Sequence, residues 1–167
     1  MLVEKNNTIL HKASTQVGPE LLADNGRGLK PIASLLIEQL SKHQAVGVSA
    51  CQIGIDLAMF AVDVDHIVKV CVNPQIVAAS SDMEKGLEGC LSFPDLWLKV
   101  NRPAAVVVRY LNIDANEVTE QLDGFMARAW LHEFDHTNGI CFTNRVSKLS
   151  LDMANRKLNK KNRRMAQ

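Results

Sequence analysis

The sequence lacks any long apolar run. Hydrophobic residues make up 47% of the 167 residues, yet no stretch approaches the roughly 18 apolar residues that cross a bilayer. The first ten residues, MLVEKNNTIL, also lack the basic segment and apolar run of a signal peptide. We therefore expect a cytoplasmic protein without membrane contact. Its length favours one domain with its own hydrophobic core.

Cysteine is scarce, and the four cysteines form no C-x-x-C pair. This spacing argues against a zinc ribbon and against a thioredoxin-type redox site. Cys71, in the apolar run VKVCV, and Cys141 have the character of reduced core residues. Cys90 instead lies among polar residues in EGCLS, so a binding role is open for it.

The net charge is only +1, but its distribution is uneven. From Arg145 to the end, eight basic residues accompany a single acidic one, Asp152, so this tail carries +7 and residues 1–144 carry −6. Such a tail is typical of an arm that binds a polyanion. A solvated, frayed terminal helix would explain the tail equally well.

Hydrophobic periodicity predicts a mixture of helices and strands. Apolar residues recur every three or four positions over residues 27–44, which indicates an amphipathic helix. Short runs rich in β-branched residues predict strands over 57–64, 67–77 and 104–113. Residues 78–102 have no clear period, so we expect a loop there with short extended pieces.

The second half of the chain predicts a turn and two further helices. Residues 114–117 form the expected turn, which leads into VTEQL. A helix follows over residues 125–138 and ends at Gly139, a usual residue just past a helix end. Residues 147–165 predict a last helix with a thin apolar face. The expected fold is α+β, with mostly antiparallel strands packed around a central metal-binding helix, an N-terminal helix and a basic C-terminal helix.

The stretch HEFDH, residues 132–136, places two histidines four positions apart on the predicted helix. Residues at this spacing lie on one helix face, so His132 and His136 can bind one ion. Glu133 lies roughly 100° round the helix, near the ion, where it can take a proton from a water molecule. Taken alone, the motif suggests a zinc endopeptidase.

The identity of the third metal ligand distinguishes a zinc endopeptidase from other metal-dependent enzymes with this motif. A catalytic site of this kind needs three protein ligands and one open position, and peptidases with this motif take the third from a nearby downstream His or Glu. After His136 the sequence offers only Asp152, in the basic tail, and Cys141. Cys90 is the best upstream candidate, since a thiolate suits Fe(II) as well as Zn(II).

A third stretch, AVGVSACQIG over residues 45–54, is rich in small residues that let a backbone approach a ligand closely. Gln52 is a neutral amide that could donate a hydrogen bond to an oxyanion. Taken alone, the stretch is explained as well by a tight connection between a helix and a strand.

Together, VGVSACQIG, EGCLS and HEFDH resemble the three motifs of the peptide deformylases, in the same order and with similar separations. The resemblance covers nearly the whole chain. It implies hydrolysis of the N-formyl group from the initiator methionine of nascent polypeptides, with release of formate. Residues 1–146 would form the catalytic domain, and residues 147–167 its basic helical extension.

The resemblance also implies roles for individual residues. Cys90, His132 and His136 would bind one divalent metal ion, Fe(II) in the cell, with Zn(II), Ni(II) or Co(II) as replacements. Glu133 would be the general base. The oxygen of the tetrahedral intermediate would be held by the amide of Gln52 and the backbone N–H of Leu91.

Helix spacing predicts where the methionine side chain binds. Residues three, four and seven positions before His132 share its helix face, so we expect a pocket lined by Val46, Gly47, Phe125, Arg128 and Ala129. Arg128 suits an apolar pocket only if its stem packs against the wall and its charged head reaches solvent.

The sequence departs from the family pattern at four further positions. Ala45, Ser49, Cys51 and Leu131 stand where glycine, alanine, proline and glutamine are usual. None of these changes removes a ligand, the base or an oxyanion donor, so we expect altered specificity or rate and an unaltered reaction. Arg128 and Leu131 are the first candidates for altered specificity.

The basic tail suggests a partner as well. In the deformylases a C-terminal helix can dock on the ribosome near the peptide exit, and we expect residues 147–167 to bind RNA phosphates there. We expect a monomer. Two alternatives stay open, a zinc endopeptidase and a non-catalytic ribosome-associated domain.

Overall fold

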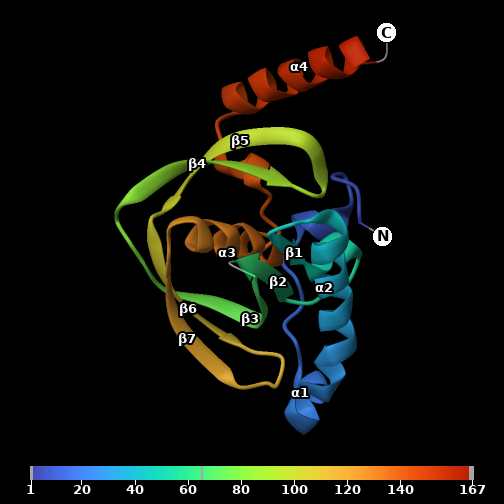
Figure 1. The fold of residues 1–167 in the computed structure, drawn as a ribbon, viewed down its shortest axis with the longest axis vertical. Helices are drawn as coiled ribbons and strands as arrows, with labels where there is room; N and C mark the ends of the chain where they lie inside the picture. Colours follow the sequence, from blue (N-terminus) through green and yellow to red (C-terminus); the bar gives the residue numbers. More distant parts are fainter. Residues whose placement is uncertain (1, 65, 166–167) are drawn as a thin grey trace.

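The computed structural model describes residues 2–64 and 66–165. Within these residues, helix α3 (Gly124–Thr137) lies between a five-stranded sheet and a separate two-stranded hairpin (Figure 1). The sheet has the strand order β1-β2-β3-β6-β7, and neighbouring strands in both sheets are antiparallel. The predicted α+β fold around a central helix is confirmed.

The five-stranded sheet contains the predicted strands. Its members are β1 (Gly47–Ser49), β2 (Met59–Val64), β3 (Ile67–Ala79), β6 (Ala105–Leu111) and β7 (Glu117–Asp123). The predictions over 57–64, 67–77 and 104–113 correspond to β2, β3 and β6 and are confirmed within a few residues. The pairing of β3 with β6 shifts register twice, as expected where a strand carries bulges and bends.

The predicted loop over residues 78–102 is wrong. Strands β4 (Met83–Cys90) and β5 (Phe93–Pro103) form a long antiparallel hairpin there. Strand β5 alternates as a half-buried strand should, with Leu98 and Val100 in a hydrophobic cluster and Trp97 outside. Strand β4 lacks this alternation of buried apolar and exposed polar residues, because its most buried residue is Glu88, a carboxylate.

The three helices predicted over residues 27–44, 125–138 and 147–165 correspond within a few residues to α2 (Lys30–His43), α3 (Gly124–Thr137) and α4 (Lys148–Met165), whereas α1 (Pro19–Gly26) was not predicted. Pro31 lies in the first turn of α2, and Gly139, with φ of 71°, follows the end of α3. The helices are η1 (Thr8–His11), α1 (Pro19–Gly26), η2 (Arg27–Leu29), α2 (Lys30–His43), η3 (Ala50–Ile53), α3 (Gly124–Thr137), η4 (Phe142–Arg145) and α4 (Lys148–Met165). None of the helices in the described ranges is long and apolar enough to span a membrane.

Two faces of α3 contact the two sheets. Trp130 is fully buried in the cluster formed with the five-stranded sheet, where its ring meets the edge of Phe60 at 5.4 Å between centroids. The opposite face carries three polar residues at positions four and three apart, Arg128, His132 and Asp135, which bond to the hairpin. The metal motif is therefore held between two sheets.

Candidate metal centre and active site

Three candidate ligands from two elements converge. Cys90 ends β4, and His132 and His136 lie one turn apart on α3. Their ligand atoms all lie within 4.8 Å of one another, and Cys90 Sγ is 3.3 Å from His136 Nε2. A thiolate and an imidazole bound to one tetrahedral ion stand about 3.5 Å apart. This donor set therefore fits one divalent ion, with a position open for water or substrate.

The surroundings of His132 favour a positive charge. Its Nδ1 lies 2.9 Å from Glu88 Oε2, which leaves Nε2 for an ion. Burial alone would lower the pKa of His132, but hydrogen bonds to Cys90 and Glu88 raise that pKa to about 10. The Glu88 carboxylate, by accepting a hydrogen bond from His132, also makes that imidazole a stronger metal ligand. Burial lowers the pKa of His136 well below its usual value, which keeps this imidazole neutral and able to ligate.

Buried ion pairs tie α3 to the hairpin. Arg102 on β5 donates to both oxygens of Glu88 at 2.9 Å and to Asp135 at 2.5 Å, and all three residues are buried. Arg145 also donates to Asp135. Burial alone would raise the pKa of Glu88, but hydrogen bonds from Arg102 and His132 lower it to about 2. Asp135 contacts arginines in this way and thus anchors the helix.

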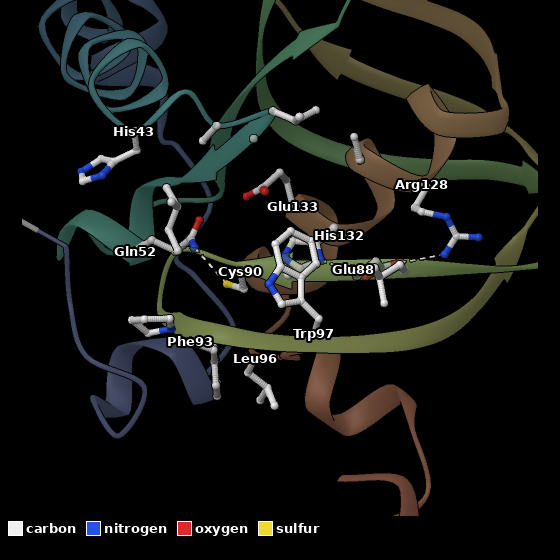
Figure 2. Close-up of a pocket in the computed structure, with 18 of the residues that line it drawn as sticks. His43, Gln52, Glu88, Cys90, Phe93, Leu96, Trp97, Arg128, His132 and Glu133 are labelled. Atoms are coloured by element: carbon white, nitrogen blue, oxygen red, sulfur yellow. Dashed lines mark hydrogen bonds and ion pairs between the residues drawn. The ribbon is translucent and has the colours of Figure 1, made fainter. Parts of the chain in front are cut away.

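The predicted base and oxyanion donor both lie beside the ligands. Glu133 is buried, and this burial raises the pKa of its carboxyl, which makes the carboxylate a stronger base. Gln52 directs Nε2 toward Cys90 Sγ at 3.3 Å and Ser92 Oγ at 3.4 Å (Figure 2). An acid–base group and an amide donor thus flank the candidate metal position.

A cavity of about 690 Å³ opens next to these groups (Figure 2). The structure brings nearly all predicted site residues into its walls, namely Val46, Gly47, Gln52, Cys90, Leu91, Phe125, Arg128, Ala129, His132 and Glu133. Sequence reasoning missed Leu87 and Trp97, which line the cavity while 57% and 60% exposed. The alternation of β5 around Trp97 was the signal that could have revealed that residue as an exposed aromatic.

The charged head of Arg128 does not reach solvent, so the condition expected for an arginine in an apolar pocket is not met. The residue is 9% exposed. Its guanidinium donates to Glu88 Oε1 at 2.9 Å and to the carbonyl oxygens of Val100 and Glu84 at 2.9 and 2.8 Å. Gly86 on β4 makes room for it, since a Cβ there would lie 2.6 Å from Arg128 Cζ.

The four departures from the family pattern have different surroundings. Ala45 has no positive φ and carries no backbone strain of that kind. Cys51 is buried, with Sγ 3.7 Å from the carbonyl oxygen of His136. Leu131 is buried in the cluster around Trp130 and is absent from the cavity wall, so it does not contact a substrate there directly. Ser49 is fully buried against Glu133.

This arrangement can activate water against a carbonyl group. An ion at the three ligands would place a water molecule near Glu133, and the amide of Gln52 would face the oxygen of a carbonyl bound in the cavity. These are the parts of a metal-dependent amide hydrolase.

Comparison with known proteins identifies the family. The family model for polypeptide deformylase matches residues 1–152. The chain is 39% identical over 118 residues to a peptide deformylase of Thermotoga neapolitana, which covers 71% of this chain and 72% of that relative. The chain belongs to the peptide deformylase family, whose members are metal-dependent hydrolases.

Solved structures agree with this assignment. The fold matches a peptide deformylase from Legionella pneumophila with a TM-score of 0.86 and 28% identity, over 100% of this chain and 97% of the other. It also matches the Met-Ala-Ser-bound class I type b peptide deformylase from Acinetobacter baumannii with a TM-score of 0.83 and 31% identity, over 87% and 97% of the two chains.

Cys90 should be the only thiol that reacts rapidly in the metal-free protein. Burial raises the pKa of Cys51 and Cys141 to about 12 and that of Cys71 higher still, whereas Cys90 is partly exposed. Because the thiolate is the reactive form, we expect iodoacetamide to label one thiol per native chain. One equivalent of Zn(II) should protect it, and Cys90→Ser should abolish the labelling. Equally fast labelling at Cys51 would contradict this.

Gly86 and Arg128 should behave as a coupled pair. Gly86→Val places a side chain against the guanidinium, and such overpacking costs about 1–3 kcal/mol. In an Arg128→Met background the clash is relieved, so the double variant should be more stable than the two single effects predict, by about 1–3 kcal/mol. Urea denaturation measures this coupling. Ile76→Val combined with Arg128→Met is the matched control and should be additive, because Ile76 is an exposed residue of β3 outside the cavity wall.

Proposed function

We propose that this chain hydrolyses the N-formyl group from the N-terminal formylmethionine of nascent polypeptides and releases formate. The observation that supports this most is the meeting of Cys90 with the two histidines of α3, beside Gln52 and Glu133, at one cavity. Family membership supports the reaction class. The Acinetobacter relative was solved with Met-Ala-Ser, a tripeptide with an N-terminal methionine, bound.

The proposed metal ligands are Cys90, His132 and His136. We propose Fe(II) in the cell, with Zn(II), Ni(II) or Co(II) as replacements, because a thiolate with two imidazoles suits these ions. When bound, such an ion lowers the pKa of a water molecule and draws electrons from the formyl carbonyl.

The chain supplies the proton transfers and the oxyanion donors. The Glu133 carboxylate takes the proton of the attacking water and later passes it to the leaving amine nitrogen. As negative charge grows on the formyl oxygen, Gln52 Nε2–H and the backbone N–H of Leu91 donate hydrogen bonds to that oxygen. The C–N bond then breaks, and formate and a free methionine amine leave.

The methionine side chain would enter the cavity beside α3. Val46 and Gly47 belong to the β1 side, and Phe125 and Ala129 to the helix side. Apolar walls of this kind suit a thioether. Arg128 does not make the pocket cationic, because its guanidinium is paired with Glu88.

Formate release from formyl-Met-Ala-Ser tests the function. The protein prepared anaerobically with Fe(II) should release formate, because oxygen attacks a thiolate-bound iron site. Glu133→Gln should reduce kcat by about 10²- to 10⁴-fold, since the residue is the general base. Gln52→Ala should reduce kcat by about 10²- to 10³-fold, as loss of one oxyanion donor does.

Matched controls make this assay decisive. Glu38→Gln changes an exposed glutamate on α2 and should leave formate release unaltered, whereas Cys90→Ala should abolish both metal retention and release. Absence of formate release by the Fe(II) protein would refute the proposal. Cleavage of unformylated casein in its place would favour a zinc endopeptidase.

We further propose that α4 docks on ribosomal RNA, so that a monomer acts on nascent chains in the cytoplasm. Leu151, Ala154 and Leu158 of this helix pack against the hydrophobic cluster that includes β5, and Lys161 pairs with Asp95 of β5 at 3.2 Å. The helix extends beyond the body of the protein (Figure 1). Its other faces are rich in exposed basic residues. These charges suit RNA phosphates, and residues 147–167 would be an extension of the catalytic domain.

Charge reversal on α4 tests this partner without removing the packing residues. Replacing the exposed residues Lys157, Lys160 and Arg164 with glutamate should weaken ribosome binding at least about 10-fold and flatten its salt dependence, because phosphate contacts release counterions. Hydrolysis of a short formyl-peptide should stay intact. Ribosome affinity is measured by cosedimentation at several salt concentrations.

The control for this experiment reverses three exposed lysines elsewhere, Lys5, Lys30 and Lys42. If the control weakens binding as much as the α4 variant, or if the α4 variant binds as tightly as the parent, α4 is not the docking element.

A further inference from the structure

One face of β1 fits closely around the carboxylate of Glu133. Residues 47 and 49 point to the same side of the strand because side chains alternate. At Gly47, a Cβ would lie 2.4 Å from Glu133 Oε1. At Ser49, the hydroxyl oxygen lies 2.7 Å from Glu133 Oε2. The carboxylate therefore lies against β1, with one oxygen over a glycine and the other on a hydroxyl.

The Ser49 hydroxyl has its proton free for Glu133. Ser49 is the N-cap residue of η3, so its side chain lies at the start of that short helix. A serine hydroxyl has a single proton to donate. Its two nearby acceptors are both on Glu133, the carboxylate Oε2 at 2.7 Å and the main-chain carbonyl at 3.1 Å. The shorter contact is with the carboxylate.

Ser49 also orients the oxyanion donor. Its backbone N–H donates to Gln52 Oε1 at 2.8 Å. With that oxygen engaged, the other end of the amide, Nε2, points toward Cys90. Ser49 thus bonds to Gln52 through its main chain and to Glu133 through its side chain. Both Ser49 and Glu133 are buried, so water competes little for these bonds.

We infer that Ser49 is a positioning residue that holds Glu133 in place for proton transfer, with Oε1 as the oxygen that takes and returns the proton. Within the part of the chain that the structure describes, Oε2 is bonded to Ser49 and Oε1 has no hydrogen-bond partner. Glu133 lines the cavity, so its free oxygen is available to a water molecule there. This inference rests on the proposed deformylation.

Alanine, the residue usual at this position in the family, would keep the main-chain bond of residue 49 to Gln52 but not its side-chain bond to Glu133. Alanine keeps the backbone N–H that binds Gln52 Oε1 but loses the hydroxyl that bonds Glu133. Ser49→Ala therefore removes the restraint on the base and keeps the main-chain bond to the amide. The reaction would continue through a base that visits the productive position less often.

Steady-state kinetics with formyl-Met-Ala-Ser tests the inference. Ser49→Ala should lower kcat about 10-fold, while KM and the affinity for Co(II) stay within about twofold of the parent, because neither cavity wall nor ligand changes. Ser49→Thr retains a hydroxyl and should recover most of the lost kcat. Ser14→Ala is the matched control, since Ser14 is also buried and its hydroxyl has no partner among the described residues.

A second measurement needs no turnover. In the metal-free protein, Ser49→Ala should lower the urea midpoint of unfolding, because a buried carboxylate loses its hydrogen-bond donor, and Ser14→Ala should leave the midpoint near that of the parent. An unchanged midpoint in Ser49→Ala would overturn the buried hydrogen bond on which the inference depends.

The outcomes separate the inference from the proposed function. A parent that releases formate and a Ser49→Ala variant with the parent kcat would overturn the positioning role and leave deformylation standing. An equal loss in Ser14→Ala, or a proportional loss of Co(II) affinity in Ser49→Ala, would show a general effect on the fold and also overturn it. A parent without formate release would remove both proposals.

Discussion

The buried carboxylate of Glu88 is the interaction on which the site depends. It accepts two hydrogen bonds from Arg102, one from Arg128 and one from His132, which fills the capacity of its two oxygens. A carboxylate buried without such partners would be strongly destabilising or would take up a proton. Because the donors come from β5 and α3, this one group joins three elements. It also turns the free nitrogen of His132 toward Cys90, two residues further along β4.

The same set of hydrogen bonds explains how α3 is held between two sheets. The apolar face of α3 is held by non-directional packing around Trp130, which sets its depth but not its rotation. The polar face supplies the directional part, since Arg128, His132 and Asp135 bond to the hairpin at fixed distances. Rotation of the helix by a few tens of degrees would break all three contacts. The two candidate metal ligands on α3 and Glu133 thereby acquire a fixed orientation before any substrate binds.

The sequence predicted features that depend on local backbone geometry, but it did not predict hydrogen bonds between residues that are far apart in the chain. The helix spacing of His132 and His136 depends only on backbone geometry, so HEFDH predicted their convergence. The hairpin escaped prediction because β4 buries Glu88, whose partners lie 14 to 44 residues away. The direction of Arg128 depends on main-chain carbonyls of the hairpin, which no side-chain pattern reveals. The sequence also did not reveal that Leu131 faces away from the cavity, because its side chain packs in the cluster around Trp130, whose partners come from distant strands.

Two departures from the family pattern, Arg128 and Ser49, each have a neighbouring glycine, Gly86 and Gly47, that leaves space for a charged side chain. The guanidinium of Arg128 occupies space that a side chain at position 86 would need, so an arginine on α3 is matched by a glycine on β4. On β1 the carboxylate of Glu133 occupies the space beside Gly47, while Ser49 bonds its other oxygen. Close packing requires this matching, because an interior at crystal-like density has no spare volume for a larger group. A cation in an apolar cavity wall would be unstable without partners. It is tolerated here because the neighbouring strand has a glycine that leaves space for it and oxygen atoms that accept its hydrogen bonds.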